Sequence, residues 1–278
     1  MPARVHRLDA ELTRRGLARS REHAVALINA GRVEVRGVIA RKPASGVAAD
    51  TSLRVIADES DPNYASRGGF KLAGALQAFP EIAVSGKRCL DAGASTGGFT
   101  DVLLRSGARQ VIAVDVGYGQ LAWNLRTDDR VIVHDRTNVR TLTPDEIGGP
   151  VDLSVADLSF ISLQLVLPAL IACTDDAGDI VPMVKPQFEV GKQRLGSGGV
   201  VRNSEHRADA VVEVARAAAG LGWASAGVCT SPLPGPSGNV EFFLWLTRTP
   251  RVECTEAQIR AIVEAAAPTT HADEGERP

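Results

Sequence analysis

Strand and helix patterns alternate along most of the chain beyond residue 88, and this order limits the fold more than any other feature. Because helical patterns separate several of the strands, we expect an α/β domain whose mainly parallel sheet is covered on both faces. The final two strand patterns are joined by a stretch of proline and glycine with no helix, which predicts an antiparallel last strand. The seven predicted strands are 88–92, 110–115, 131–134, 151–156, 179–184, 223–230 and 240–247, with helices at 100–105, 163–171 and 205–221.

The start of the chain has a different pattern. Leucines at helical spacing predict a first helix, and Ser20 is a suitable N-cap for a second helix that Gly31 would end. Two short alternating segments, 32–36 and 52–56, predict strands. We therefore divide the chain into a small α+β domain (1–57), a polar linker (58–65), the sheet domain (66–250), and a C-terminal helix with a disordered tail (251–278).

Charge is distributed unevenly along the chain. Residues 1–57 hold eleven Lys or Arg and five Asp or Glu, a net charge of +6; the whole chain has −2, so the remainder carries −8. A basic module on an acidic body favours binding to a polyanion, although a solvated basic face gives the same count. Aromatic residues make up only 4% of the chain, which favours recognition of folded RNA by its shape.

Composition and spacing exclude several classes of protein. The 44% apolar and 23% charged fractions are typical of a globular chain. No apolar stretch is long and unbroken enough to cross a membrane, and the Arg-rich start lacks the apolar segment of a signal peptide. The four cysteines have no CxxC spacing and the five histidines are scattered, so we expect a reduced cytoplasmic protein with no metal site and no stable membrane insertion.

A glycine-rich loop follows the first predicted strand of the sheet domain. Residues 89–99 are Cys-Leu-Asp-Ala-Gly-Ala-Ser-Thr-Gly-Gly-Phe, a strand that leads into the loop and then into a helix. Open α/β sheets bind ligands at the carboxyl ends of their strands, and Asp115, which ends the next strand, can accept hydrogen bonds from a ribose diol. The predicted cofactor-binding residues are Asp91, Gly93, Ser95, Thr96, Gly97, Gly98, Phe99, Asp115 and Asp157.

Two cofactors fit this loop. A dinucleotide site usually has the pattern Gly-x-Gly-x-x-Gly, but Ser95 stands at the second glycine and would crowd a pyrophosphate. The carboxylate of Asp91 would repel phosphate and suits a ligand with an amino group and a sulfonium. These residues favour S-adenosylmethionine over a dinucleotide, and a loop without a ligand is the third alternative.

Four charged residues, three of them at or near strand ends, form a second candidate site. Asp157 and Lys185 follow the fourth and fifth strands, Glu241 belongs to the last hairpin, and Lys71 lies in a helix before the first strand. Because strand ends share one edge of the sheet, we expect these four residues to meet in one crevice; four separate surface charges are the alternative. The aromatic residues predicted to lie in the core are Phe99, Trp123, Phe160 and Trp245, with Phe160 also a candidate ligand contact.

The motifs resemble the FtsJ-like ribose 2′-O-methyltransferases, whose active sites use a Lys-Asp-Lys-Glu tetrad. The Arg-rich start resembles the S-four RNA-binding fold. The resemblance implies a Rossmann-like class I methyltransferase domain with a seven-stranded sheet, beside an RNA-binding domain. Four runs are similar to the TlyA family: Ala-Gly-Ala-Ser-Thr-Gly-Gly-Phe (92–99), Ala-Asp-Leu-Ser-Phe-Ile-Ser (156–162), Val-Lys-Pro-Gln-Phe-Glu (184–189) and Pro-Gly-Pro-Ser-Gly-Asn-Val-Glu (234–241).

This resemblance implies methylation of a cytidine 2′-hydroxyl in small- and large-subunit ribosomal RNA, with S-adenosylmethionine as methyl donor and Lys71, Asp157, Lys185 and Glu241 as catalytic residues. We expect Lys185 to take or polarise the hydroxyl proton, helped by repulsion from Lys71 and opposed by the two acids, which orient the ammonium groups. Ribosomal subunits are the expected partner, and no protein partner is indicated. The predicted phosphate contacts are Arg7, Arg19, Arg21, Arg32, Arg36, Arg41 and Lys42.

Three alternatives stay open at this stage. The sheet domain of a nicotinamide oxidoreductase would have a similar order of elements. An RNA-binding factor in ribosome assembly would need the basic domain but no catalysis. Members of the resembling family are also labelled haemolysins, which makes a membrane-active protein the last alternative.

Overall fold

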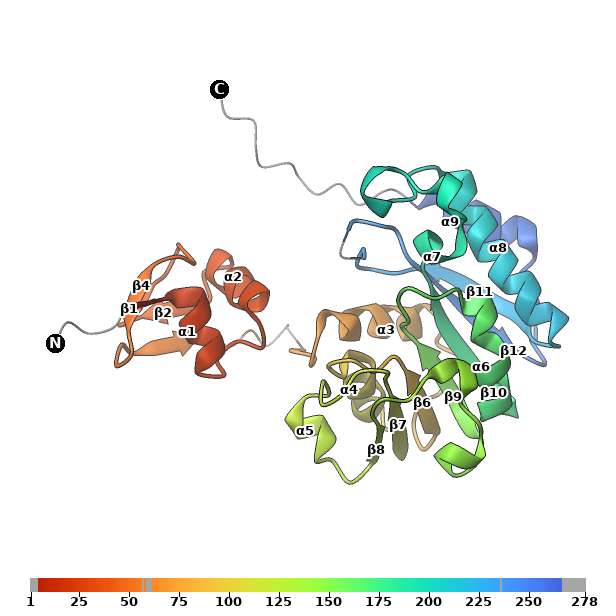
Figure 1. Cartoon of the computed structure of the whole chain (residues 1–278), viewed down its shortest axis with the longest axis horizontal. Coiled ribbons are helices and arrows are strands. Elements are labelled where there is room, and N and C mark those ends of the chain that lie inside the picture. The colour runs from red at the N-terminus through yellow and green to blue at the C-terminus, as the bar shows by residue number, and fades with distance from the viewer. Residues whose placement is uncertain (1–4, 57, 59–61, 236, 267–278) are drawn as a thin grey trace. The chain divides into compact units, whose positions relative to one another are not determined.

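The computed structural model describes residues 5–56, 58, 62–235 and 237–266. The chain divides into two compact units, Met1–Asn63 and Tyr64–Pro278, and the boundary falls inside the segment predicted as the linker. Figure 1 shows the elements of each unit. The tail predicted to be disordered lies outside the described residues.

The N-terminal unit packs two helices on short strands. Its apolar core includes Leu8 and Leu12 of the first helix and Ile28 of the second, all essentially inaccessible to solvent. Ser20 caps the second helix as predicted, because its hydroxyl accepts the backbone N–H of His23. The elements are β1 (Val5–Arg7), α1 (Leu8–Arg14), α2 (Arg21–Asn29), β2 (Val33–Val35), β3 (Val38–Ile39), β4 (Gly46–Ala48) and β5 (Leu53–Val55).

The strands of this unit form two small antiparallel sheets. One has the order β3-β2-β5, which contains both predicted strands. The other pairs β1 with β4, two strands that the sequence did not indicate. Each is only three residues long, and their partners are about 40 residues apart in sequence, so neither has a local pattern or a turn to mark it.

The second unit contains a seven-stranded sheet of order β11-β12-β10-β9-β6-β7-β8. The five strands from β10 to β8 are parallel, and β12 and β11 are antiparallel to their neighbours. The predicted fold class is therefore confirmed. The strands are β6 (Arg88–Ala92), β7 (Gln110–Val114), β8 (Val131–His134), β9 (Val151–Ala156), β10 (Thr174–Val184), β11 (Ala224–Thr230) and β12 (Phe242–Thr247).

Helices cover both faces of this sheet and bury a separate apolar core on each (Figure 1). Side chains of successive strand residues point to opposite faces, so Cys89 joins the core under α3 and α4, whereas Leu90 joins the core under α6, α8 and α9. The α-helices are α3 (Arg67–Ala78), α4 (Gly98–Arg105), α5 (Trp123–Arg126), α6 (Leu167–Cys173), α7 (Pro186–Glu189), α8 (Ser204–Gly220) and α9 (Glu256–Ala265); the 3-10 turns are η1 (Val139–Thr141), η2 (Asp145–Ile147), η3 (Leu163–Leu165), η4 (Lys192–Arg194) and η5 (Ser197–Gly199).

The predicted start of the helix at 163–171 is wrong. The segment 163–171 begins as the 3-10 turn η3, and α6 starts only at Leu167. Pro168 occupies the first turn of α6, where its missing N–H costs no helical hydrogen bond, so the α-helix begins around the proline instead of running through it.

Within the described ranges, no helix is both long and apolar enough to span a bilayer. The same residues contain no group of three or more His, Cys, Asp or Glu side chains placed to hold a metal ion.

Candidate active site

The glycine-rich loop connects β6 to α4 at the carboxyl edge of the sheet. Gly93 has φ +87°, and a Cβ there would lie 2.5 Å from the backbone oxygen of Asp157. Gly97 has φ +95° and is the N-cap of α4. Ser95, between them, adopts φ +48°, an uncommon conformation for a residue with a side chain. The glycines therefore let the loop turn tightly against the segment that carries Asp157.

Asp115 fixes the far side of this loop. Its carboxylate accepts the backbone N–H of Ser95 through Oδ2 (2.8 Å) and that of Gly117 through Oδ1 (2.7 Å). Each oxygen keeps a second lone pair, so Asp115 retains the capacity to accept hydrogen bonds from a ligand.

Asp91 lies beneath the loop and is completely buried. Its Oδ2 accepts the hydroxyl of Thr100 (2.7 Å), while Oδ1 has no hydrogen-bond partner among the described residues. Burial raises the pKa of Asp91 to about 7; the Thr100 hydrogen bond opposes this shift, and the nearby charge of Asp157 adds to it. Asp91 lines neither of the two cavities described below. It would therefore act on a ligand indirectly, by the electrostatic effect of its charge and by supporting the conformation of the loop.

The four predicted catalytic residues form two ion pairs. Lys71 Nζ lies 2.5 Å from Glu241 Oε2, and Lys185 Nζ lies 2.6 Å from Asp157 Oδ1. Both lysines are 7% exposed and Glu241 is 1% exposed, whereas the Asp157 side chain is 25% exposed. Buried charges of this kind are costly unless they are paired, so each lysine has its own acid.

The sheet register explains how residues far apart in sequence come together. Central strand β10 pairs with β9, where Pro182 lies opposite Ala156, and with β12, where Val184 lies opposite Phe242. Asp157 and Lys185 directly follow β9 and β10, and Glu241 directly precedes β12, so all three sit at one edge of the sheet.

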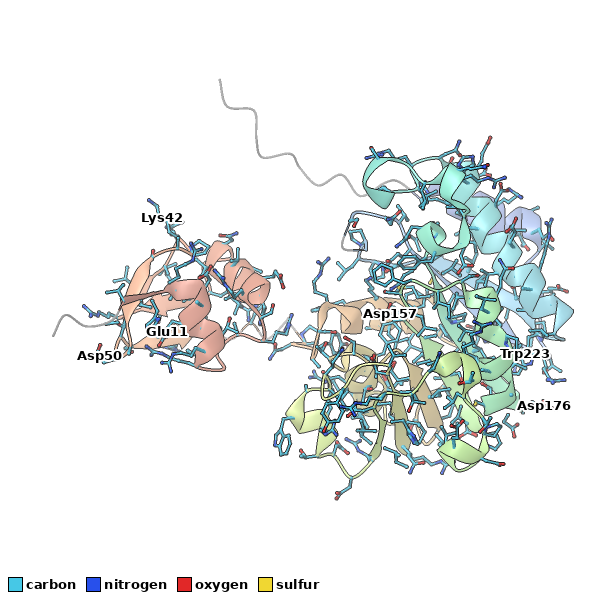
Figure 2. All side chains as sticks on the ribbon, in the orientation of Figure 1. Glu11, Lys42, Asp50, Asp157, Asp176 and Trp223 are labelled. Carbon is cyan, nitrogen blue, oxygen red and sulfur yellow. The ribbon has the colours of Figure 1, made fainter. Side chains whose placement is uncertain are left out.

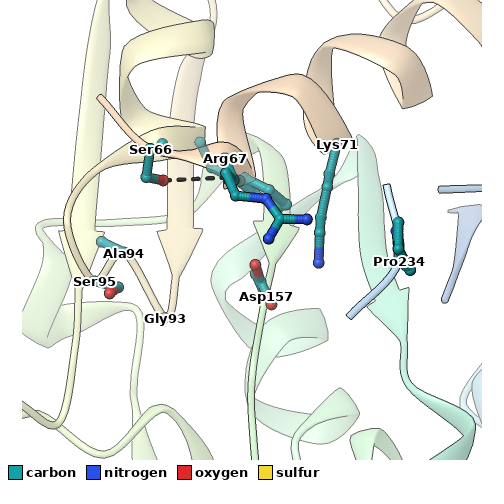
Figure 3. A pocket seen from close by; sticks show the side chains of 11 residues that line it. Ser66, Arg67, Lys71, Gly93, Ala94, Ser95, Asp157 and Pro234 are labelled. Atoms are coloured by element: carbon teal, nitrogen blue, oxygen red, sulfur yellow. Dashed lines mark hydrogen bonds between the residues drawn. The ribbon is translucent and has the colours of Figure 1, made fainter. Parts of the chain in front are cut away.

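Two cavities open at this edge and share the loop. The smaller, about 190 Å³, contains Lys71 and Asp157 in its wall, so it joins the two ion pairs in one site. In Figure 3, Arg67 and Lys71 extend from α3 toward the end of β9, where Asp157 lies. The larger cavity, about 540 Å³, is lined by residues that include Asp115 and Arg140. Gly93, Ser95 and Asp157 line both cavities.

The predicted cofactor residues divide into two groups. Those in the cavity walls are Gly93, Ser95, Gly98, Phe99, Asp115 and Asp157. Asp91, Thr96 and Gly97 line neither cavity: Asp91 and Gly97 are buried behind the loop, and Thr96 is exposed. Asp91 and Gly97 therefore support the turn of the loop, and the geometry of the two cavities does not support Thr96 as a cofactor contact.

Two of the four aromatic predictions are wrong. Phe99 is buried and packs near Phe243 (ring centroids 6.0 Å apart), and Trp245 packs near Phe79 (5.8 Å). Trp123, at the start of the short helix α5, is 76% exposed. Phe160 is 91% exposed, because its loop turns through φ +64° and directs the ring away from the core to lie beside Phe188.

Sequence reasoning missed several residues of the site. Ser159 accepts a hydrogen bond from Lys185 Nζ (3.0 Å), and Arg67 lines the smaller cavity. Glu189 binds the loop after β9 through Ser162. All three lie within four residues of a predicted catalytic residue, and that proximity was the signal available for them.

The predicted RNA contacts lie in the N-terminal unit and differ in their surroundings. Arg7 and Arg21 both bind the buried carboxylate of Asp9, and hydrogen bonds from Arg7 above all hold the pKa of that carboxyl well below its usual range. Arg19 binds the side chain of Asn63, and Arg32 binds the backbone oxygen of Ile56. Every member of the set except Arg32 is exposed, including Arg36, Arg41 and Lys42, the last labelled in Figure 2.

Comparison with known proteins gives the same division of the chain. Residues 64–248 match the FtsJ-like methyltransferase family, and residues 6–51 match the S4 domain. The chain is 63% identical to the 16S/23S rRNA (cytidine-2′-O)-methyltransferase TlyA of Mycobacterium tuberculosis, over 90% of this chain and 92% of that protein. It is 34% identical to Hemolysin A of Brachyspira hyodysenteriae, over 85% of this chain and 97% of that protein.

A solved structure from Streptococcus thermophilus, named as a hemolysin, superimposes with a TM-score of 0.73 and 38% identity; the match covers 93% of this chain and 94% of that chain. The hemolysin name thus occurs among relatives that share both units with this chain. The family resemblance of the sequence motifs is confirmed: this chain belongs to the FtsJ-like methyltransferases and, within them, to the TlyA family.

Proposed function

We propose that this protein methylates the ribose 2′-hydroxyl of cytidine in small- and large-subunit ribosomal RNA, with S-adenosylmethionine as the methyl donor. The observation that carries the proposal is the pair of lysine–carboxylate contacts, Lys71–Glu241 and Lys185–Asp157. One member of each pair, Lys71 and Asp157, lines the cavity beside the glycine-rich loop, and Lys185 and Glu241 stand behind them. The names of the relatives supply the substrate, and the residues supply a chemistry that fits it.

The residues present fit the methyl donor. The larger cavity places the Asp115 carboxylate where it would accept hydrogen bonds from a ribose diol, and Asp157 borders both cavities as an acceptor for cationic groups. Oδ1 of Asp91, which is buried and has no hydrogen-bond partner among the described residues, adds a latent negative charge beneath the loop. When bound, S-adenosylmethionine would supply an electrophilic methyl group on a sulfonium.

Lys185 is the group that we assign to the hydroxyl proton. A ribose hydroxyl is a weak nucleophile, so a base or a hydrogen-bond partner must draw off its proton as the methyl group is transferred. Asp157 and Ser159 both bind Lys185 Nζ and both line the larger cavity, so the ammonium group is held directly behind that wall. Glu241 holds Lys71 in the same way, and Lys71 would bind an oxygen of the nucleotide. Much of the rate would come from this fixed geometry.

The RNA would be recognised by both units. Arg36, Arg41 and Lys42 present exposed cations for phosphates, which give affinity with little base specificity. Phe160, exposed at the rim of the larger cavity, offers a ring face on which the target base would stack. A ribosomal substrate also implies that the protein acts in the cytoplasm.

The test is methyl transfer to ribosomal subunits that lack the modification. The protein is incubated with methyl-labelled S-adenosylmethionine and each subunit, and the RNA is digested to nucleosides; subunits that are already modified serve as the control. We expect label in 2′-O-methylcytidine from unmodified subunits only. Label on a base would overturn the substrate assignment. Unlabelled RNA would also overturn it, provided that the protein binds the methyl donor. Binding of a nicotinamide dinucleotide in place of the donor would overturn the methyltransferase assignment itself.

A further inference from the structure

A contact outside the tetrad joins the two loops that carry Asp157 and Lys185. Glu189, the last residue of α7, accepts the hydroxyl of Ser162 at Oε2 (2.6 Å) and the backbone N–H of Leu163 at Oε1 (2.8 Å). Glu189 lies four residues after Lys185, and Ser162 lies five residues after Asp157. One carboxylate therefore connects the segment beyond the catalytic lysine to the segment beyond its acid.

The other contacts between these loops are weaker or more exposed. The rings of Phe160 and Phe188 lie 5.2 Å apart, but Phe160 is almost fully open to solvent. Lys185 itself also joins the two loops, through its ion pair with Asp157 and its hydrogen bond to Ser159, but both of these contacts end on the flexible lysine side chain and not on the backbone of its segment. Glu189 is half-buried, and burial raises the pKa of its carboxyl while its hydrogen bonds lower it. Hydrogen bonds to a shielded carboxylate are among the stronger ones in proteins.

We propose that Glu189 is a positioning residue that holds the loop 157–163 against the segment 185–189 and thereby fixes Lys185 on Asp157. This inference rests on the proposed function, because its consequence is the rate of methyl transfer. Glu189 lines neither cavity, and its hydrogen bonds go to Ser162 and Leu163 and not to the two ion pairs, so it acts through the two loops. A displacement of about 1 Å in a reacting group can reduce a rate by about 100-fold.

The variants Glu189→Ala and Glu189→Gln separate positioning from charge. Alanine removes both hydrogen bonds, whereas glutamine keeps an acceptor for the N–H of Leu163 and offers its amide N–H to the hydroxyl of Ser162. Glu146→Ala is the matched control. Glu146 lies in η2, before β9. Its carboxylate also accepts one backbone N–H (2.8 Å) and one hydroxyl (2.9 Å), both from Thr143.

We would measure kcat and KM for methyl transfer to ribosomal subunits, together with thermal stability, for the three variants and the wild type. Positioning predicts that Glu189→Ala lowers kcat by about 10- to 100-fold while the KM for S-adenosylmethionine stays within about threefold. Glu189→Gln should keep kcat within about threefold of wild type, and Glu146→Ala should keep both constants. An unchanged kcat in Glu189→Ala, or an equal loss in Glu189→Gln, would overturn the proposal.

Amide hydrogen exchange of the segment 158–166 gives a readout that does not need the reaction. We expect faster exchange in Glu189→Ala, since the N–H of Leu163 loses its acceptor, and near-wild-type exchange in Glu189→Gln. Unchanged exchange in Glu189→Ala would overturn the link between the loops. If wild type transfers no methyl group but Glu189→Ala still speeds exchange, the proposed function fails while the link between the loops stands.

Discussion

Replacing Asp91 by asparagine should make the cofactor-free protein more stable at neutral and basic pH. Asp91 is completely buried, one of its oxygens has no partner among the described residues, and burial raises its pKa from 3.8 to about 7. Below pH 3.8 the acid is protonated in both states and costs nothing. Between pH 3.8 and 7 the unfolded chain loses the proton while the folded chain keeps it, so stability falls as pH rises.

The size of this loss follows from the two pKa values. The difference of about three pH units corresponds to about 4 kcal/mol at pH 7 and above, at about 1.36 kcal/mol per unit. Asparagine keeps an acceptor for Thr100 but places an amide donor at the unpartnered position, which costs about 1–3 kcal/mol. We therefore expect the difference in unfolding free energy between the variant and the wild type to rise by about 3 kcal/mol from pH 5 to pH 8. The cost of the amide donor lowers this difference by the same amount at both pH values.

Urea unfolding at pH 5 and pH 8, followed by tryptophan fluorescence, measures this difference. Trp123, Trp223 and Trp245 are the three tryptophans of the chain and all belong to the second unit, so the signal reports that unit alone. Asp115→Asn is the control, because that acid already accepts two backbone N–H groups and should not gain stability when it loses its charge. If the unfolding free energies of Asp91→Asn and wild type differed by the same amount at pH 5 and at pH 8, the reasoning would be refuted.

Two further predictions concern RNA binding. Phe160→Ala should slow methyl transfer to subunits by about 10- to 100-fold, because it removes a stacking energy of about 1–3 kcal/mol. The melting temperature should not change, because Phe160 is 91% exposed. A lower melting temperature or an unchanged rate would contradict this prediction. Replacing Arg36, Arg41 and Lys42 together by alanine should reduce the slope of log affinity against log salt by about two to three, measured by subunit binding at several salt concentrations. An unchanged slope would remove these residues from the RNA interface.

The sheet domain was predictable because its information is local. Most strands contain a short apolar run, the longer helices have their own periodicity, and the loop after β6 has a distinctive glycine pattern. The β1–β4 pair was not predictable, since three-residue strands far apart in sequence have no local signal. Strand β10 also starts earlier than predicted, at Thr174, because residues 175–178 (Asp-Asp-Ala-Gly) are types that strands rarely contain. The register with β9 shifts between Thr174 and Asp179, in the same segment.

The meeting of the four charged residues was predictable, but their pairing was not. The positions of the strand ends indicated that Asp157, Lys185 and Glu241 would share an edge, and Lys71 was expected to join them from the helix before the first strand. Which lysine binds which acid depends on β10 lying between β9 and β12, and this order of strands is a property of the whole sheet. Phe160 shows the reverse case: an aromatic residue is expected in a core by default, and only the backbone turn at φ +64° places it in solvent.

The most direct test of the account is the single-turnover rate of methyl transfer in Lys185→Ala, with subunits and S-adenosylmethionine both saturating. Lys87→Ala is the matched control, because Lys87 also pairs with an aspartate, Asp179 (3.0 Å), but lies just before β6, at the opposite edge of the sheet. We expect Lys185→Ala to lose about 10²- to 10⁴-fold in rate while both ligands still bind within about threefold of wild type, and Lys87→Ala to keep its rate. A Lys185→Ala rate within tenfold of wild type would contradict the assignment of the hydroxyl proton to this lysine.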